Sequence, residues 1–161
     1  MIILYHDMIL EDDYSFYFYS NGGYVTSPKI GRYCGNRIYP IIKSDSNILM
    51  VKFRSDNSLS APGFEIFWDG TTIGKYLYNV IDLWSLLKRF KRGIQFVCPP
   101  LLIFLGCGGE LTSSTGAFTS PGYPQPYHHN AECIWTISVS QGSRIQLIFV
   151  DINLEESPAC R

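Results

Sequence analysis

The sequence predicts an all-β protein, and three observations support this class. Aromatic residues, which favour half-buried strands, make up 15% of the 161 residues. The 14 glycines and 9 prolines punctuate the chain and favour short strands and tight turns over long helices. Several short segments alternate apolar and polar residues with a period of two. With 46% hydrophobic and 17% charged residues, the chain is expected to fold rather than be disordered.

Four segments carry this two-residue period. Residues 47–53 are followed by a loop rich in Ser, Asp, Asn, Pro and Gly, and residues 63–69 form another strand. Near the C-terminus, residues 133–139 and 145–149 alternate in the same way, so we expect a hairpin meander with one buried face. The side chains expected on inner faces are Leu49, Val51, Phe53, Trp135, Ile137, Val139, Ile145, Leu147 and Phe149.

Residues 75–106 interrupt this pattern. Apolar residues between Leu77 and Phe90 fall near helical spacing, and a basic cluster, Lys88–Arg92, follows. The apolar run after it, Ile94–Leu105, contains two prolines and is too short to cross a bilayer, which needs about 20 apolar residues. We therefore expect this segment to be distinct from the strands on either side.

The overall composition excludes several classes of function. A net charge of −1 gives no general basic surface for nucleic acid. The chain has no Gly-x-Ser-x-Gly, His-Glu-x-x-His or phosphate-binding glycine loop, so no residue is a candidate for catalysis and we do not expect an enzyme. His128 and His129 are expected to be surface residues, and His6 has no second metal ligand nearby.

The five cysteines lack zinc-site spacing, which makes disulfides the better interpretation. An odd number predicts at least one thiol without a partner in this chain. The first residues, Met1–Asp13, lack a basic start and a continuous apolar run, so they are a poor signal peptide.

The two ends of the chain resemble each other. Residues 4–11 superpose without a gap on residues 148–155, which aligns Asp7 with Asp151 and Glu11 with Glu155. Eight residues are a weak repeat alone, but they suggest that the chain starts within one structural unit and ends within a second copy of it.

Longer motifs are typical of one family. The second part of the chain has a Cys-Gly-Gly opening at Cys107, a Ser-Pro-Gly-Tyr-Pro turn at residues 120–124 and a Cys-x-Trp-x-Ile strand from Cys133. This part resembles the first half of a CUB domain, and residues 30–68 resemble the second half of another. The resemblance implies a CUB-type antiparallel β-sandwich in two incomplete copies separated by a non-CUB insert.

This resemblance sets the expected domain boundaries. Residues 1–73 are the C-terminal part of one CUB domain, residues 74–106 are the insert, and residues 107–161 are the N-terminal part of a second domain. In this chain each half-sandwich would expose open strand edges and apolar faces, so we expect poor independent folding.

The family also implies a pattern of disulfides. Its first two cysteines bond to each other, which pairs Cys107 with Cys133; two reduced buried thiols are the alternative. Its third cysteine bonds to the one in the Tyr-Cys-Gly motif, where Cys34 lies, but the partner expected near residues 12–16 is absent. Cys34, Cys98 and Cys160 are therefore predicted to be unpaired in this chain.

Many CUB domains bind calcium through a Glu and two Asp side chains from separate loops, and this resemblance makes calcium the expected cofactor. In the first copy Glu11 and Asp56 match the pattern, with Asn57 and Ser58 as helpers. The middle Asp is missing, and Asp12 or Asp13 is the candidate substitute for it. In the second copy only Glu155 is present. Both sites are expected to be incomplete, and a solvated acidic loop is the alternative.

The resemblance implies an extracellular or cell-surface protein that binds protein ligands, as part of an endocytic receptor built from many CUB copies. Calcium-ordered carboxylates would hold a Lys or Arg of the ligand, and membrane contact would be indirect, through a full-length receptor or a partner subunit. The alternative is the non-catalytic CUB region of a tolloid-like secreted metalloprotease.

The insert has a second interpretation at the level of nucleic acid. The codons of Gly74, Lys75 and Tyr76 can contain a splice donor, and those of Cys98–Gly106 can form a pyrimidine-rich tract that ends in an acceptor. We hypothesise that residues 75–106 are a translated intron. The rival is a membrane-associating amphipathic insert, since basic residues lie next to apolar ones.

Overall fold

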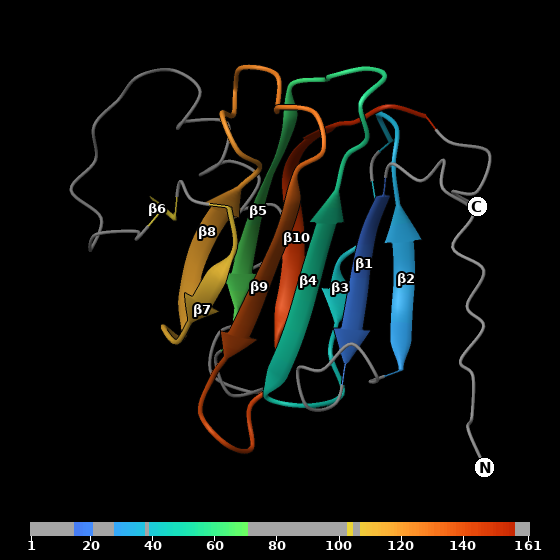
Figure 1. Cartoon of the computed structure of the whole chain (residues 1–161). Helices are drawn as coiled ribbons and strands as arrows, with labels where there is room; N and C mark the ends of the chain where they lie inside the picture. Colours follow the sequence, from blue (N-terminus) through green and yellow to red (C-terminus); the bar gives the residue numbers. More distant parts are fainter. Residues whose placement is uncertain (1–14, 21–27, 38, 71–102, 105–106, 157–161) are drawn as a thin grey trace, which may run out of the picture.

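The computed structural model describes residues 15–20, 28–37, 39–70, 103–104 and 107–156, which form two five-stranded sheets (Figure 1). The first sheet has the order β2-β1-β4-β9-β7, and the second has the order β3-β10-β5-β8-β6. The strands of the first sheet are β1 (Ser15–Ser20), β2 (Lys29–Tyr33), β4 (Ile48–Arg54), β7 (Gly109–Leu111) and β9 (Glu132–Ser138). Those of the second are β3 (Ile42–Lys43), β5 (Gly63–Asp69), β6 (Ile103–Phe104), β8 (Thr115–Thr119) and β10 (Gln146–Asn153).

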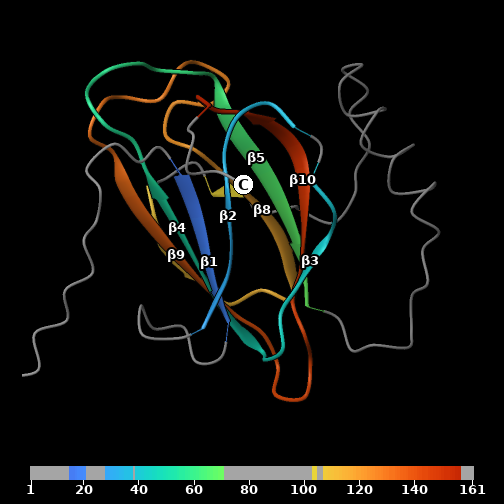
Figure 2. The same cartoon turned by 90° about the vertical axis from the view of Figure 1, so that its right-hand side faces the viewer.

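The two sheets are stacked as the layers of a sandwich. Figure 2 shows them edge-on, with β1, β4 and β9 in one layer and β5, β8 and β10 in the other. Most neighbouring strands are antiparallel; β7 with β9 and β6 with β8 are the parallel pairs among the described residues. The predicted all-β class and the sandwich are confirmed.

The core lies between the sheets and is rich in aromatic rings. The ring centroids of Phe118 and Trp135 are 5.0 Å apart, and Phe64 contacts both Phe53 and Trp135 edge-on. Trp68 and Trp135 are fully buried. Every side chain expected on an inner face is buried here except Phe149, which is half-buried and packs against the core. Such tilted and edge-on aromatic pairs add to the free energy gained by burial alone.

The two parts of the chain build this one sandwich together. We call residues 15–70 the first segment and residues 107–156 the second segment. Strand β4 pairs with β9 from Ile48↔Ser138 to Arg54↔Glu132, and β5 lies between β8 and β10. The expectation that each part exposes open edges and apolar faces is therefore wrong for the central strands, because each part covers the other.

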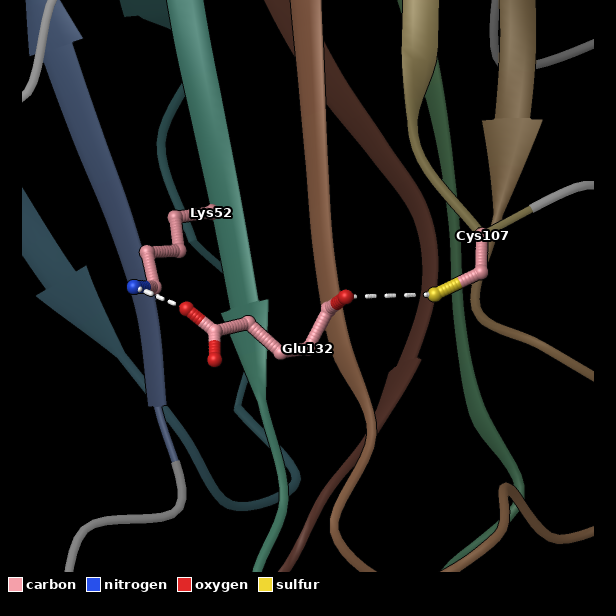
Figure 3. A network of polar contacts seen from close by, with 3 residues as sticks. All are labelled: Lys52, Cys107 and Glu132. Atoms are coloured by element: carbon pink, nitrogen blue, oxygen red, sulfur yellow. Dashed lines mark hydrogen bonds and ion pairs between the residues drawn. The ribbon is translucent and has the colours of Figure 1, made fainter.

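Polar contacts also join the two segments. Lys52 on β4 forms an ion pair of 2.5 Å with Glu132 on β9, across the outer face of the first sheet (Figure 3). At one end of the sandwich, the Ser44 hydroxyl accepts a hydrogen bond of 2.8 Å from the Ile145 N–H. The boundaries that assign the parts to two family copies remain a prediction.

The C-terminal hairpin expected from the sequence does not form. Strand β9 lies in the first sheet between β4 and β7, whereas β10 lies in the second sheet between β3 and β5. Both strands have a buried apolar face, and these faces point toward each other across the core. The turn near Gly142 therefore connects the two layers rather than two paired strands.

Within the insert, residues 103–104 form β6 and pair with β8. The helical spacing near Leu77–Phe90 and the basic cluster fall outside the described residues. Within the part of the chain that the structure describes, no helix is long and apolar enough to cross a membrane.

The disulfide Cys107–Cys133 is present, with Cα atoms 4.8 Å apart, which confirms this pairing. The Cys107 sulfur also lies 3.5 Å from the Glu132 carbonyl oxygen (Figure 3), a contact rather than a hydrogen bond because a disulfide sulfur carries no hydrogen. Cys34 is disulfide-bonded too, so its predicted unpaired state is wrong. Because Cys107 and Cys133 bond to each other, its partner is Cys98 or Cys160, both of which lie outside the described residues.

Candidate cation site at one end of the sandwich

The loop after β4 is anchored by a buried serine. The Ser55 hydroxyl donates to the His128 carbonyl at 2.9 Å and accepts from the Ala131 N–H at 2.8 Å. The Asn130 N–H donates to the Asp56 carbonyl at 2.7 Å. Asn130 adopts a positive φ of 55°, which Asn tolerates better than most residues. These bonds hold the loop of the first segment against the loop before β9 in the second.

The chain after β10 is fixed at the same end of the sandwich. The Gly35 N–H donates to the Glu155 carbonyl at 2.9 Å, and the Leu154 N–H donates to the Gly35 carbonyl at 3.2 Å. Gly35 has φ of 74°, a conformation that glycine adopts without strain. This pairing places Glu155 directly after β10, beside the loop that contains Cys34.

The Glu155 side chain is half-buried, and its two carboxylate oxygens have different surroundings. The Tyr127 hydroxyl donates to Oε1 at 3.4 Å, while Oε2 is buried without a hydrogen-bond partner among the described residues. Burial raises the pKa of Glu155, and the negative charge of Asp56 raises it further. The Tyr127 hydrogen bond and the nearby His129 act in the opposite direction. The carboxylate therefore lies where a positive charge would stabilise it.

Asp56 is presented by a local turn. Its Oδ1 accepts a hydrogen bond of 2.6 Å from the Ser58 N–H, the contact that Asp side chains make in Asx turns. Asn57 and Ser58 are exposed next to it. Leu59 follows on the same loop with 62% of its surface exposed, which is high for a large apolar side chain. The loop thus offers a carboxylate and an apolar side chain to solvent.

The structure groups the predicted ligands differently from the sequence. Asp56 and Glu155 were assigned to separate copies, but they lie close enough for the charge of one to change the pKa of the other. Asn57 lies on the same loop as Asp56, and Glu11 lies outside the described residues. Among the described residues, no group of three or more His, Cys, Asp or Glu side chains could hold a metal ion.

Two residues near the carboxylates were missed by the sequence reasoning. Tyr127 is 2% exposed and bonds to Glu155, and burial together with the Glu155 charge raises the pKa of its hydroxyl. His129 was expected to be a plain surface residue; it is exposed, but its charge acts on Glu155. The one signal for Tyr127 and His129 in the sequence is an aromatic residue next to a pair of His residues in a loop between two strands.

A family model for the CUB domain matches residues 7–68 and 107–161. The chain belongs to the CUB domain family. The two matched stretches cover residues 15–68 of the first segment and the whole of the second segment, and they leave out residues 69–106. The family resemblance inferred from the Cys-Gly-Gly opening and the Cys-x-Trp-x-Ile strand is confirmed.

Among curated proteins, cubilin is similar to this CUB chain. The chain is 40% identical to rat (Rattus norvegicus) cubilin over 140 residues and 36% identical to human (Homo sapiens) cubilin over 140 residues. Each alignment covers 87% of this chain. The chain spans only 3% of the length of these cubilins.

A second kind of relative is bone morphogenetic protein 1 of Xenopus laevis. It is 30% identical over 159 residues, which cover 88% of this chain and 21% of the relative. No solved structure shows a significant match.

Proposed function

We propose that this chain is an extracellular protein-binding CUB module from a cubilin-like endocytic receptor, and that it binds its protein ligands in a calcium-dependent way. The observation that carries the proposal is that Asp56 and Glu155 are held at the same end of the sandwich by the loop before β9, through the Asn130 N–H bond to the Asp56 carbonyl and the Tyr127 hydroxyl bond to Glu155. The cubilin similarity over most of the chain supports the receptor class.

Calcium fits the chemistry of this end. Two carboxylates from separate loops, with the Asn57 amide and the Ser58 hydroxyl nearby, provide the hard oxygen ligands that Ca²⁺ prefers. The buried Glu155 Oε2 has no hydrogen-bond partner among the described residues, so a cation would satisfy it. Because the described residues contain no cluster of three or more His, Cys, Asp or Glu side chains that could hold the ion, a further ligand has to come from elsewhere in the protein or from water.

The calcium would act on the loops and on the protein ligand. It would offset the repulsion between Asp56 and Glu155 and so fix the loop of residues 55–58. The remaining negative charge would attract a Lys or Arg of the ligand, as the family resemblance implies, and Leu59 would contact apolar surface beside that residue.

The alternative is the non-catalytic CUB region of a tolloid-like secreted metalloprotease. The similarity to bone morphogenetic protein 1 favours this possibility. A CUB module has the same binding role in both cases. A His-Glu-x-x-His motif in the flanking sequence would favour the protease, and further CUB copies would favour the receptor.

Calcium-dependent stability tests the proposal. We expect millimolar Ca²⁺ to raise the melting temperature of the chain, and Mg²⁺ to raise it less, because Mg²⁺ needs a stricter octahedral geometry. Asp56→Asn and Glu155→Gln should each abolish most of the calcium effect. Asp45→Asn, at an exposed position before β4 and far from this loop end, is the matched control. An equal calcium effect in all four proteins would contradict the site.

A further inference from the structure

The second sheet has an outer face, the side that points away from the first sheet. Trp68 on β5 points into the core, so its neighbour Phe67 points to the outer face. Phe67 lies in register with Ile148 on β10 and with Ala117 on β8. Ala117 in turn lies in register with Ile103 on β6. These positions form one apolar row that crosses the sheet from β10 to β6.

Carboxylates lie on both sides of this apolar row. On β5, Asp69 and Glu65 are each two residues from the row, about 7 Å away along the strand. Glu65 is directly opposite Asp151 on β10, and Asp151 accepts a hydrogen bond of 2.9 Å from the Tyr123 hydroxyl. The exposed Lys43 lies at the edge of the face, beyond β10. Because two carboxylates directly opposite each other repel, this side of the row favours a cation.

Part of the outer face is covered in this chain. Ala117 points outward, because Gly116 and Phe118 on either side of it face the core. Ala117 is nevertheless only 2% exposed. Neither Glu65 nor Asp69 is free, since each interacts with another group of the chain. An outward Ala on an uncovered sheet would be open to water, so these observations indicate that a further part of the chain lies on this face.

Residues 71–102 are joined to this same sheet at both ends. They follow Gly70, directly after β5, and they precede Ile103, where β6 begins. Strand β8 lies between β5 and β6, so the two strands are about 10 Å apart. The inner face of the sheet is filled by the core. The outer face is therefore the surface of this sheet that is left to the connection.

The sequence of residues 77–92 fits such a surface. Its apolar residues fall near helical spacing, which places them on one side of a helix. They are Leu77, Val80, Ile81, Trp84, Leu87 and Phe90. The basic cluster Lys88–Arg92 adds four cations. A helix over residues 77–92 would be about 24 Å long, whereas the row from β10 to β6 is about 14 Å wide, so the helix could cross the whole row.

We propose that residues 77–92 dock as an amphipathic helix on the outer face of the second sheet. The apolar row receives the apolar side of the helix, which removes both from water. The carboxylates beside the row attract the cations of the basic cluster. The segment then acts as a covering layer of the sandwich rather than as a membrane-binding element. Its origin at the transcript level does not enter, because the proposal concerns the chain that contains it.

Trp84 provides a direct readout of this docking. The chain has three Trp residues, and Trp68 and Trp135 are fully buried. Acrylamide quenching of the fluorescence therefore reports mainly on Trp84, and Trp84→Phe supplies the background from the other two. We expect Trp84 in the full chain to be quenched several-fold less than a free tryptophan amide.

Charge reversal tests the acidic sides of the row. Glu65→Lys with Asp69→Lys should make Trp84 several-fold more accessible to acrylamide, because the face then repels the basic cluster. Reversal of the four cations of the cluster to Glu in the same protein should restore the protection. The matched control is Asp45→Lys with Glu110→Lys, two exposed carboxylates outside this face, which should leave the quenching unchanged.

Carbodiimide cross-linking of the unaltered chain decides the question if a reversed variant fails to fold. Peptide mass spectrometry should find a lysine of the basic cluster joined to a carboxylate of the outer face. The Lys52–Glu132 ion pair, at 2.5 Å on the first sheet, is the internal standard for the reaction.

Four results would overturn the proposal. They are quenching of Trp84 as strong as that of the free amide, the absence of such a cross-link when the standard forms, equal protection of Trp84 in every folded variant, and protection that appears only when phosphatidylserine vesicles are added. The last result would support the membrane-associating interpretation of the insert instead.

Discussion

Removal of the Cys107–Cys133 disulfide is expected to lower the free energy of unfolding by about 3.5 kcal/mol. The bond closes a loop with a sequence separation of 26, and the chain-entropy relation gives this value at 25 °C. The effect should be local at first, because β7 has only three residues, Gly109–Leu111, and pairs with β9 alone. Without the bond, β7 would separate from the edge of the first sheet before the rest of the sandwich unfolds.

The variant to measure is Cys107→Ser with Cys133→Ala. Cys107 is exposed, so a hydroxyl there meets water, whereas Cys133 is fully buried and needs an apolar replacement. Reduction of the parent protein is a poor substitute, because it also breaks the disulfide of Cys34.

Urea unfolding is the assay. A loss of about 3.5 kcal/mol at an m value of ~2 kcal/mol/M moves the midpoint down by roughly 1.8 M. Cys107→Ser alone should show nearly the same shift, because it already opens the loop. A loss below about 1 kcal/mol at unchanged m would refute the loop-entropy argument. A changed m value would show instead that the bond acts on the compactness of the unfolded chain.

Three further predictions concern other parts of the molecule. The raised pKa of Glu155 means that the folded state keeps the Glu155 proton to a higher pH than the unfolded chain does. Without calcium, the stability should therefore fall as the pH rises above the ordinary Glu pKa of about 4.3. Glu155→Gln should flatten this part of the plot of melting temperature against pH, and an unchanged plot would contradict the assignment. Gly116→Ala places a Cβ 2.1 Å from the buried Trp68 ring and should destabilise the sandwich by about 1–3 kcal/mol in urea unfolding, whereas Gln125→Ala on an exposed loop should have little effect. Transcript reads across the Gly74 codon should mostly omit residues 75–106, and the intron hypothesis fails if properly spliced transcripts retain them.

Local sequence was sufficient for the strands themselves. The alternation around Val51 and Trp135 predicted β4 and β9 because a strand shows its side chains to opposite faces in turn, which is visible in any short window. The family motifs then predicted the sandwich and the Cys107–Cys133 bond, both of which are confirmed. Asp56 and Glu155 were also named as candidate calcium ligands from the sequence, and this assignment stays a prediction.

The pairing of distant strands was decided only by the tertiary structure. The alternation of apolar residues in β9 and β10 is compatible with a paired hairpin or with strands in opposite sheets. In the structure the two strands lie in opposite sheets, and their apolar faces both pack into the core between the sheets. In the same way, residues 4–11 and 148–155 have the same pattern, so local sequence does not decide which of them lies beside β5; the structure places β10 there. Glu155 consequently lies near Asp56, although the sequence assigned them to different copies. The physical reason is that apolar faces and unpaired strand edges are buried by whichever complementary segment the chain can bring to them, and that choice depends on the whole fold.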